Sequence, residues 1–141
     1  MSNHLAIVVH TAPRPPLSQR PVEMCEHKGI GHPDTLTDGA CEAAAIALAR
    51  AYLSTFGKVL HFNVDKGLLI AGRSFPSFGG GIVLEPVRLI VCGRATNPDG
   101  KLDIEGIVMN AVRGHLERSV GPASTYFHIL CEIKEGSANL K

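Results

Sequence analysis

The run from Glu26 to Asp34 gathers the residue types that bind phosphate groups and divalent metal ions. It reads Glu-His-Lys-Gly-Ile-Gly-His-Pro-Asp, so carboxylates, imidazoles and a lysine surround two glycines. Glycine lets the backbone approach a ligand closely, and Pro33 suits the start of a helix, whose first N–H groups attract anions. Asp34 and Glu26 are candidate ligands of a hard divalent cation. His32 and Lys28 are candidate phosphate contacts, although an ordinary loop with a helix cap fits the same spacing equally well.

Length and charge narrow the class of protein. The 141 residues suit one domain, and a net charge of +1 with only 5% aromatic residues argues against nucleic acid as a partner. The apolar stretches at 40–53 and 82–92 are interrupted by charged residues, which excludes a membrane span there. The first residues lack the pattern of a signal peptide, so we expect a cytoplasmic protein. The four cysteines are scattered and predict neither a zinc site nor a disulfide framework.

Hydrophobic periodicity predicts the elements that position the run. An N-terminal lead at 1–20 combines a strand at 5–9 with a proline-rich stretch, and a domain at 21–141 follows. A strand at 22–26 leads into the glycine loop. A helix opens at Pro33 or Asp34 and ends at Phe56 before Gly57, with one face of small side chains that permits close packing.

The rest of the chain predicts an α+β domain. We expect strands at 60–64 and 127–133, extended chain at 67–72, a long strand at 82–92 bent near Pro86, and a second helix from Ile104 that ends before Gly121. The Gly-, Pro- and Ser-rich segment 73–81 reads as a loop without regular structure. This order implies two layers, with both helices on one face of a mainly antiparallel sheet. The other sheet face then needs a cover, which predicts association with a partner or further domains.

A series of short motifs runs along the chain in a fixed order. The strings are Pro-Val-Glu at 21–23, Gly-Ile-Gly-His-Pro-Asp at 29–34, Thr-Asp-Gly at 37–39, Asn-Val-Asp-Lys at 63–66, Gly-Arg-Ser at 72–74, Phe-Gly-Gly-Gly at 78–81, Glu-Pro at 85–86 and Gly-Arg-Ala-Thr at 93–96. In this order they resemble the S-adenosylmethionine synthetases (methionine adenosyltransferases), in particular the archaeal-type branch. A shared order over about half the chain makes coincidence improbable.

The resemblance implies a reaction between ATP and L-methionine. The methionine sulfur attacks C5′ of ATP and expels triphosphate, which is then cleaved to pyrophosphate and phosphate. By motif position, His32 is similar to the family histidine that contacts the triphosphate, and Asp34 and Glu26 are similar to Mg²⁺ ligands. Lys28, Gly29 and Gly31 complete the implied triphosphate site, and K⁺ is a further candidate ion.

The resemblance is weaker beyond the glycine loop. Asp65, Lys66 and Arg73 are candidates for the rim of the site, although charged residues at strand ends are at least as often simply solvated. Ser77 and Ile82 stand where the archaeal-type pattern favours a basic and an acidic residue.

Family members are several-fold longer than this chain and have three similar domains in a dimer with active sites between subunits. The resemblance therefore implies the N-terminal portion of such an enzyme, which needs complementing domains, in a homo-oligomer or supplied separately, for activity. The alternative is a non-catalytic module that keeps the fold and serves phosphate binding or dimerisation.

Overall fold

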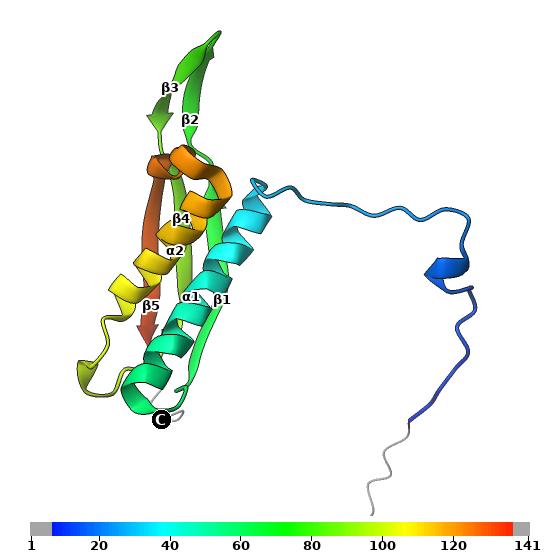
Figure 1. The fold of residues 1–141 in the computed structure, drawn as a ribbon, viewed down its shortest axis with the longest axis horizontal. Helices are drawn as coiled ribbons and strands as arrows, with labels where there is room; N and C mark the ends of the chain where they lie inside the picture. The colour runs from blue at the N-terminus through cyan, green and yellow to red at the C-terminus, as the bar shows by residue number, and fades with distance from the viewer. Residues whose placement is uncertain (1–6, 137–141) are drawn as a thin grey trace, which may run out of the picture.

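The computed structural model describes residues 7–136 (Figure 1). Residues 33–136 form two helices, a three-stranded sheet and a projecting β-hairpin, whereas residues 7–32 run outward as an exposed extended segment. The elements in chain order are η1 (Leu17–Gln19), α1 (Pro33–Phe56), β1 (Phe62–Ile70), β2 (Arg73–Ser77), β3 (Gly80–Glu85), β4 (Val87–Ala95), η2 (Pro98–Gly100), α2 (Ile104–Val120), η3 (Gly121–Tyr126) and β5 (Phe127–Glu135).

The larger sheet has the strand order β1-β4-β5. β1 pairs with β4 in antiparallel fashion, while β4 and β5 are parallel because α2 forms the crossover between them. β2 and β3 form a separate antiparallel hairpin. Both helices pack side by side on one face of the larger sheet (Figure 1), so the predicted two-layer α+β fold is confirmed. Strand pairing is mainly antiparallel when the hairpin is included, because only β4 and β5 are parallel.

The core lies between the helices and the sheet. Buried side chains recur every four residues on α1, which places them on one helix face. They meet three buried residues of α2 and the inward residues of β4 and β5. The fully or nearly fully buried set is Leu36, Ala40, Ala44, Leu48, Tyr52, Leu89, Val91, Ala95, Val108, Val112, Leu116 and Ile129.

The ends of the long helix are set by local chemistry, as the sequence predicted. His32 is the N-cap, and its Nδ1 accepts a hydrogen bond from the Asp34 backbone N–H at 3.2 Å. Pro33 occupies the first turn, where its missing N–H costs no hydrogen bond. Gly57 ends the helix in the left-handed conformation with φ of 71°. The N-cap therefore holds the glycine loop at the N-terminus of α1.

Two predicted strands are wrong. Residues 7–9 and 22–26 are exposed and belong to no sheet, and residues 5 and 6 of the first predicted strand lie outside the described part of the chain. Both segments are rich in apolar residues, but a strand forms only when a neighbouring strand satisfies its backbone N–H and C=O groups. Within residues 7–136 neither segment has such a neighbour.

The predicted loop at 73–81 is also wrong, because this segment forms β2, a tight turn and the start of β3. Ser77 pairs with Gly80, and Gly79 takes a φ of 79° in the turn between them. Pro76 is tolerated because a two-stranded hairpin leaves one edge of each strand without backbone partners. The predicted long strand at 82–92 is divided at Pro86 into β3 and β4.

Candidate functional site

The N-terminus of α1 borders a polar cleft of about 400 Å³ beside β1. The helix contributes its first turns, the preceding loop contributes one lysine, and β1 closes one side with its backbone at Gly67. The lining residues are Lys28, Pro33, Asp34, Thr35, Thr37, Asp38, Gly67, Leu68 and Leu69. Two of the predicted site residues, Lys28 and Asp34, therefore lie in one cleft.

The glycines of the loop are not required by packing within this chain. A Cβ atom at Gly29 or Gly31 would meet no described atom within 4 Å, and neither glycine has a positive φ. The loop is closed by a hydrogen bond from the His32 N–H to the Gly29 carbonyl at 3.0 Å. The space above the two glycines is therefore open to a ligand.

Lys28 and Asp34 form an exposed ion pair within the cleft. The hydrogen bond from Lys28 lowers the pKa of Asp34, and the same hydrogen bond raises the pKa of Lys28. The nearby charge of Asp38 also contributes to the raised pKa of Lys28. These shifts favour the ammonium form of Lys28 and the carboxylate form of Asp34, and Asp38 lies beside them in the cleft.

Asp38 is a site residue that the sequence analysis did not single out. It lies one helical turn after Asp34, and residues four apart share one side of a helix. The four-residue spacing between Asp34 and Asp38 could have indicated from the sequence that both carboxylates lie on one side of the helix. The sequence named Glu26 as the second carboxylate, but Glu26 lies in the exposed segment before the helix and does not line either cleft described here.

The donors of the polar cleft fit a magnesium ion that is shared with phosphate. Mg²⁺ prefers oxygen ligands and is commonly held by one or two carboxylates together with phosphate oxygens and water. Asp34 and Asp38 offer two such carboxylates. Within residues 7–136 no group of three or more His, Cys, Asp or Glu side chains is placed to hold a metal ion.

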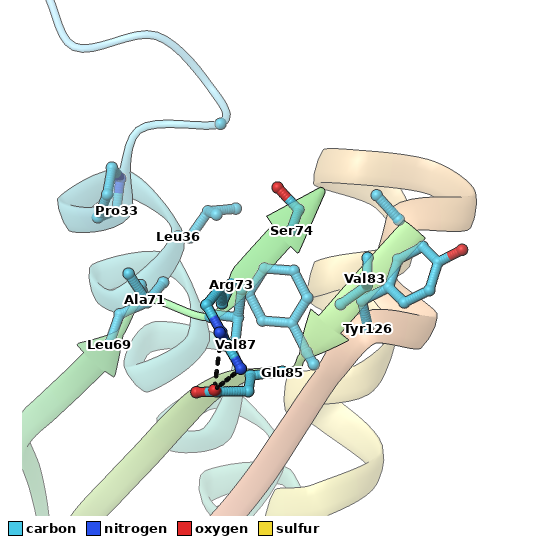
Figure 2. Close-up of a pocket in the computed structure, with 14 residues that line it drawn as sticks. Pro33, Leu36, Leu69, Ala71, Arg73, Ser74, Val83, Glu85, Val87 and Tyr126 are labelled. Atoms are coloured by element: carbon cyan, nitrogen blue, oxygen red, sulfur yellow. Dashed lines mark hydrogen bonds and ion pairs between the residues drawn. The ribbon is translucent and has the colours of Figure 1, made fainter. Parts of the chain in front are cut away.

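A second, mainly apolar cleft of about 450 Å³ shares Pro33 and Leu69 with the polar one (Figure 2). It lies at the base of the hairpin, where Arg73 Nε donates to Glu85 Oε1 at 2.9 Å. The lining residues are Gly31, Pro33, Leu36, Leu69, Ala71, Gly72, Arg73, Ser74, Val83, Glu85, Val87, Ala123, Tyr126 and Phe127. The cleft suits an apolar group whose polar end reaches the Arg73–Glu85 pair.

The three candidate rim residues separate in the structure. Arg73 lines the apolar cleft, whereas Asp65 and Lys66 pair with each other at 2.7 Å on the exposed part of β1 and line neither cleft. The hydrogen bond from Lys66 lowers the pKa of Asp65.

Comparisons with known proteins agree with the motifs. A profile of the S-adenosylmethionine synthetase (AdoMet synthetase) family matches residues 5–141. The chain is 40% identical over 129 residues to the S-adenosylmethionine synthase of Methanothrix thermoacetophila, covering 89% of this chain and 32% of that relative. The corresponding enzyme of Hyperthermus butylicus is 40% identical over 143 residues, covering 95% and 35%. That of Haloarcula marismortui is 39% identical over 139 residues, covering 94% and 35%.

Fold and cleft together define a two-layer α+β domain with a polar cleft at a helix N-terminus. The chain belongs to the S-adenosylmethionine synthetase family, and the archaeal-type resemblance read from the motifs is confirmed. It spans about a third of the length of the curated relatives that it matches. Among the described residues no helix is both long enough and apolar enough to cross a membrane.

Proposed function

We propose that this chain supplies the triphosphate and magnesium portion of an S-adenosylmethionine synthase acting on ATP and L-methionine. The observation that carries the proposal is the polar cleft, in which Lys28, Asp34 and Asp38 meet at the N-terminus of α1. Negative charge accumulates on the triphosphate as it leaves C5′, so positioned cations and N–H donors at that place stabilise the transition state. When bound, magnesium supplies additional charge neutralisation for the same oxygens.

The residues of the loop take distinct roles in this proposal. The first N–H groups of α1 and the backbone around Gly29 and Gly31 bind phosphate oxygens, as helix N-termini commonly do. Lys28 adds a positive charge, and His32 donates from Nε2 because its Nδ1 already accepts the helix cap. Asp34 is the proposed metal ligand, with Asp38 and the predicted Glu26 as further carboxylates. K⁺ stays a candidate without an assigned ligand.

The proposal includes domains beyond this chain. Matched relatives are about three times as long, so the adenosine contacts and the rest of the methionine pocket are expected from complementing domains or from another subunit. The apolar cleft by Arg73 is a place for the methionine side chain, since a thioether chain is apolar and its amino-acid end is charged. Misplacement of reacting groups by about 1 Å costs roughly a hundredfold in rate, so the isolated chain should be inactive.

Isothermal titration with tripolyphosphate, with and without Mg²⁺, tests the proposal. The wild-type chain should release magnesium-dependent heat, and a His32→Ala, Asp34→Ala double variant should not. Lys134→Met is the matched control, because it breaks another exposed ion pair, with Glu132 at 2.7 Å, on a strand outside the cleft. If the wild-type chain does not bind tripolyphosphate with Mg²⁺, the proposed site is wrong.

The alternative function is a non-catalytic module that keeps the phosphate site. The enzyme portion and the non-catalytic module can be distinguished by adding the remaining two thirds of an archaeal relative as a second polypeptide. Formation of S-adenosylmethionine from ATP and methionine only in the mixture supports the enzyme portion, and magnesium-dependent binding without turnover in the mixture supports the module.

A further inference from the structure

Asp34 is paired with a cationic side chain of the protein, the ammonium group of Lys28. Lys28 Nζ is hydrogen-bonded to Asp34 Oδ2, and both side chains line the polar cleft together with Asp38. The negative charge of Asp38 acts on the same ammonium group. A lysine of the chain therefore pairs with one of the two carboxylates that are proposed to hold magnesium, and the second carboxylate lies in the same cleft.

The Lys28–Asp34 ion pair is weak enough for Lys28 to change its partner. The side chains of Lys28 and Asp34 are 43% and 58% exposed, and exposed ion pairs of this kind shift an equilibrium by about fivefold or less. Lysine carries its charge on a long stem with several rotatable bonds, so the ammonium group can move to a neighbouring anion while the backbone stays in place. The open space above Gly29 and Gly31, on either side of Ile30, leaves room for that anion next to Lys28.

Charge explains why the two proposed ligands should be coupled. A dication that binds to Asp34 while Lys28 stays there meets an ammonium group within a few ångströms, which opposes binding. A triphosphate carries several negative charges and attracts the same ammonium group more strongly than one carboxylate does. Binding of triphosphate is therefore expected to release Asp34 for the metal.

We propose that Lys28 is an internal cation that pairs with Asp34 before ligands bind and transfers to the triphosphate when this ligand binds, so that metal binding depends on triphosphate. The inference rests on the proposed function of the cleft. It adds that Lys28 acts with opposite sign on the two ligands, since it opposes the metal alone and favours the triphosphate alone.

Titration of each ligand by itself tests the opposite signs. At low ionic strength, Lys28→Met should bind Mn²⁺, a substitute for Mg²⁺, about tenfold more tightly than the wild-type chain does. The same variant should bind tripolyphosphate without metal about tenfold more weakly. Lys28→Arg keeps the charge and should stay within about threefold of wild type for Mn²⁺. Lys134→Met, which breaks the pair with Glu132, should change neither affinity. Far-ultraviolet circular dichroism checks that the helices are intact in every variant.

Mn²⁺ binding by Lys28→Met decides whether Lys28 opposes the metal. Equal or weaker Mn²⁺ binding by Lys28→Met, including no measurable binding in either protein, overturns it. If that result appears while the wild-type chain still binds tripolyphosphate with Mg²⁺, the exchange by Lys28 is wrong and the proposed site stands. If tripolyphosphate with Mg²⁺ also fails to bind, the proposed function fails as well.

Discussion

His32 illustrates how one side chain serves both the fold and the proposed site. Its Nδ1 caps α1 by accepting the Asp34 N–H, and its Nε2 is proposed to contact phosphate. Replacement by alanine removes both contacts, so a loss of binding in that variant has two explanations. A residue that caps a helix without an imidazole is needed to separate them.

Asparagine at position 32 separates the cap from the phosphate contact. His32→Ala should lower the free energy of unfolding by about 1 kcal/mol, because alanine is a poor N-cap, whereas His32→Asn should stay close to wild type. Both variants should bind tripolyphosphate about tenfold or more weakly, because neither keeps a ring N–H at that place. Urea unfolding gives the first quantity and isothermal titration the second. If His32→Asn binds tripolyphosphate as tightly as the wild-type chain, His32 serves only as a helix cap and does not contact phosphate.

At this scale, local chemistry could be predicted and remote contacts could not. Pro33 and Gly57 mark the ends of α1 because their backbone preferences are intrinsic to the residue. The buried hydroxyl of Tyr52 donates a hydrogen bond to the Thr96 carbonyl at 2.7 Å. The sequence could not predict this contact, because the two residues are 44 positions apart. Asp38 was readable from its spacing to Asp34, but the cleft that gives the spacing a meaning comes from the fold.

At the scale of elements, α1 and α2 approach closely where a glycine faces a histidine. A Cβ atom at Gly39 would lie 2.2 Å from Cε1 of His115, so the imidazole ring occupies the space that a side chain would take. Burial lowers the pKa of His115, and the charge of Arg118 lowers it further. A backbone hydrogen bond with Leu36 acts in the opposite direction without cancelling the shift. The helix pair therefore favours the neutral ring.

The lowered pKa of His115 predicts that the domain is less stable in mild acid. The unfolded chain takes up a proton near the ordinary histidine pKa of about 6.5, while the folded chain does so only at lower pH. The contribution of His115 is complete above about pH 7.5, and it falls as the pH drops through 6.5 toward the lowered pKa. His115→Gln should flatten the dependence of the unfolding free energy on pH below about pH 7.5, as measured by urea titrations at a series of pH values.

A second variant identifies the cause of the His115 shift. Arg118→Gln removes the smaller of the two effects that lower the pKa, so the pH dependence should shrink but persist. A pH dependence that is identical in wild type and His115→Gln would show that the ring titrates alike in the folded and unfolded chains.

The elements also differ in how far sequence predicted them. Each helix carries its own period and caps, so both were placed from local pattern. Strands depend on neighbours, and the strand predicted at 22–26 has no partner within the described chain. The glycine and proline content of 73–81 predicted a loop. Composition does not reveal which residues pair across a hairpin, and here Phe75 pairs with Ile82. The apolar cleft by Arg73 exists only because that hairpin forms.

At the scale of the whole molecule, the sheet face opposite the helices carries an apolar row. Ile90 in the central strand pairs with Leu68 on one side and Leu130 on the other, and alternate residues in these strands point to the helix core. In the flanking rows Arg88 pairs with His128, and Cys92 pairs with Glu132. An apolar centre with a polar rim is typical of a protein interface. In the present chain no element covers this face among residues 7–136 (Figure 1).

We expect this face to mediate association of the chain, because burial of the apolar row stabilises any assembly that removes it from water. Leu130→Glu should weaken self-association by about a hundredfold, since an unpaired carboxylate would be buried in the interface. Leu53→Glu is the control, because Leu53 is an exposed leucine, 52% accessible, on the helix layer. Sedimentation velocity over a range of concentrations measures the effect. A wild-type chain that stays monomeric at every concentration, or equal weakening by both substitutions, would exclude this face as the contact surface and leave its cover to the complementing domains.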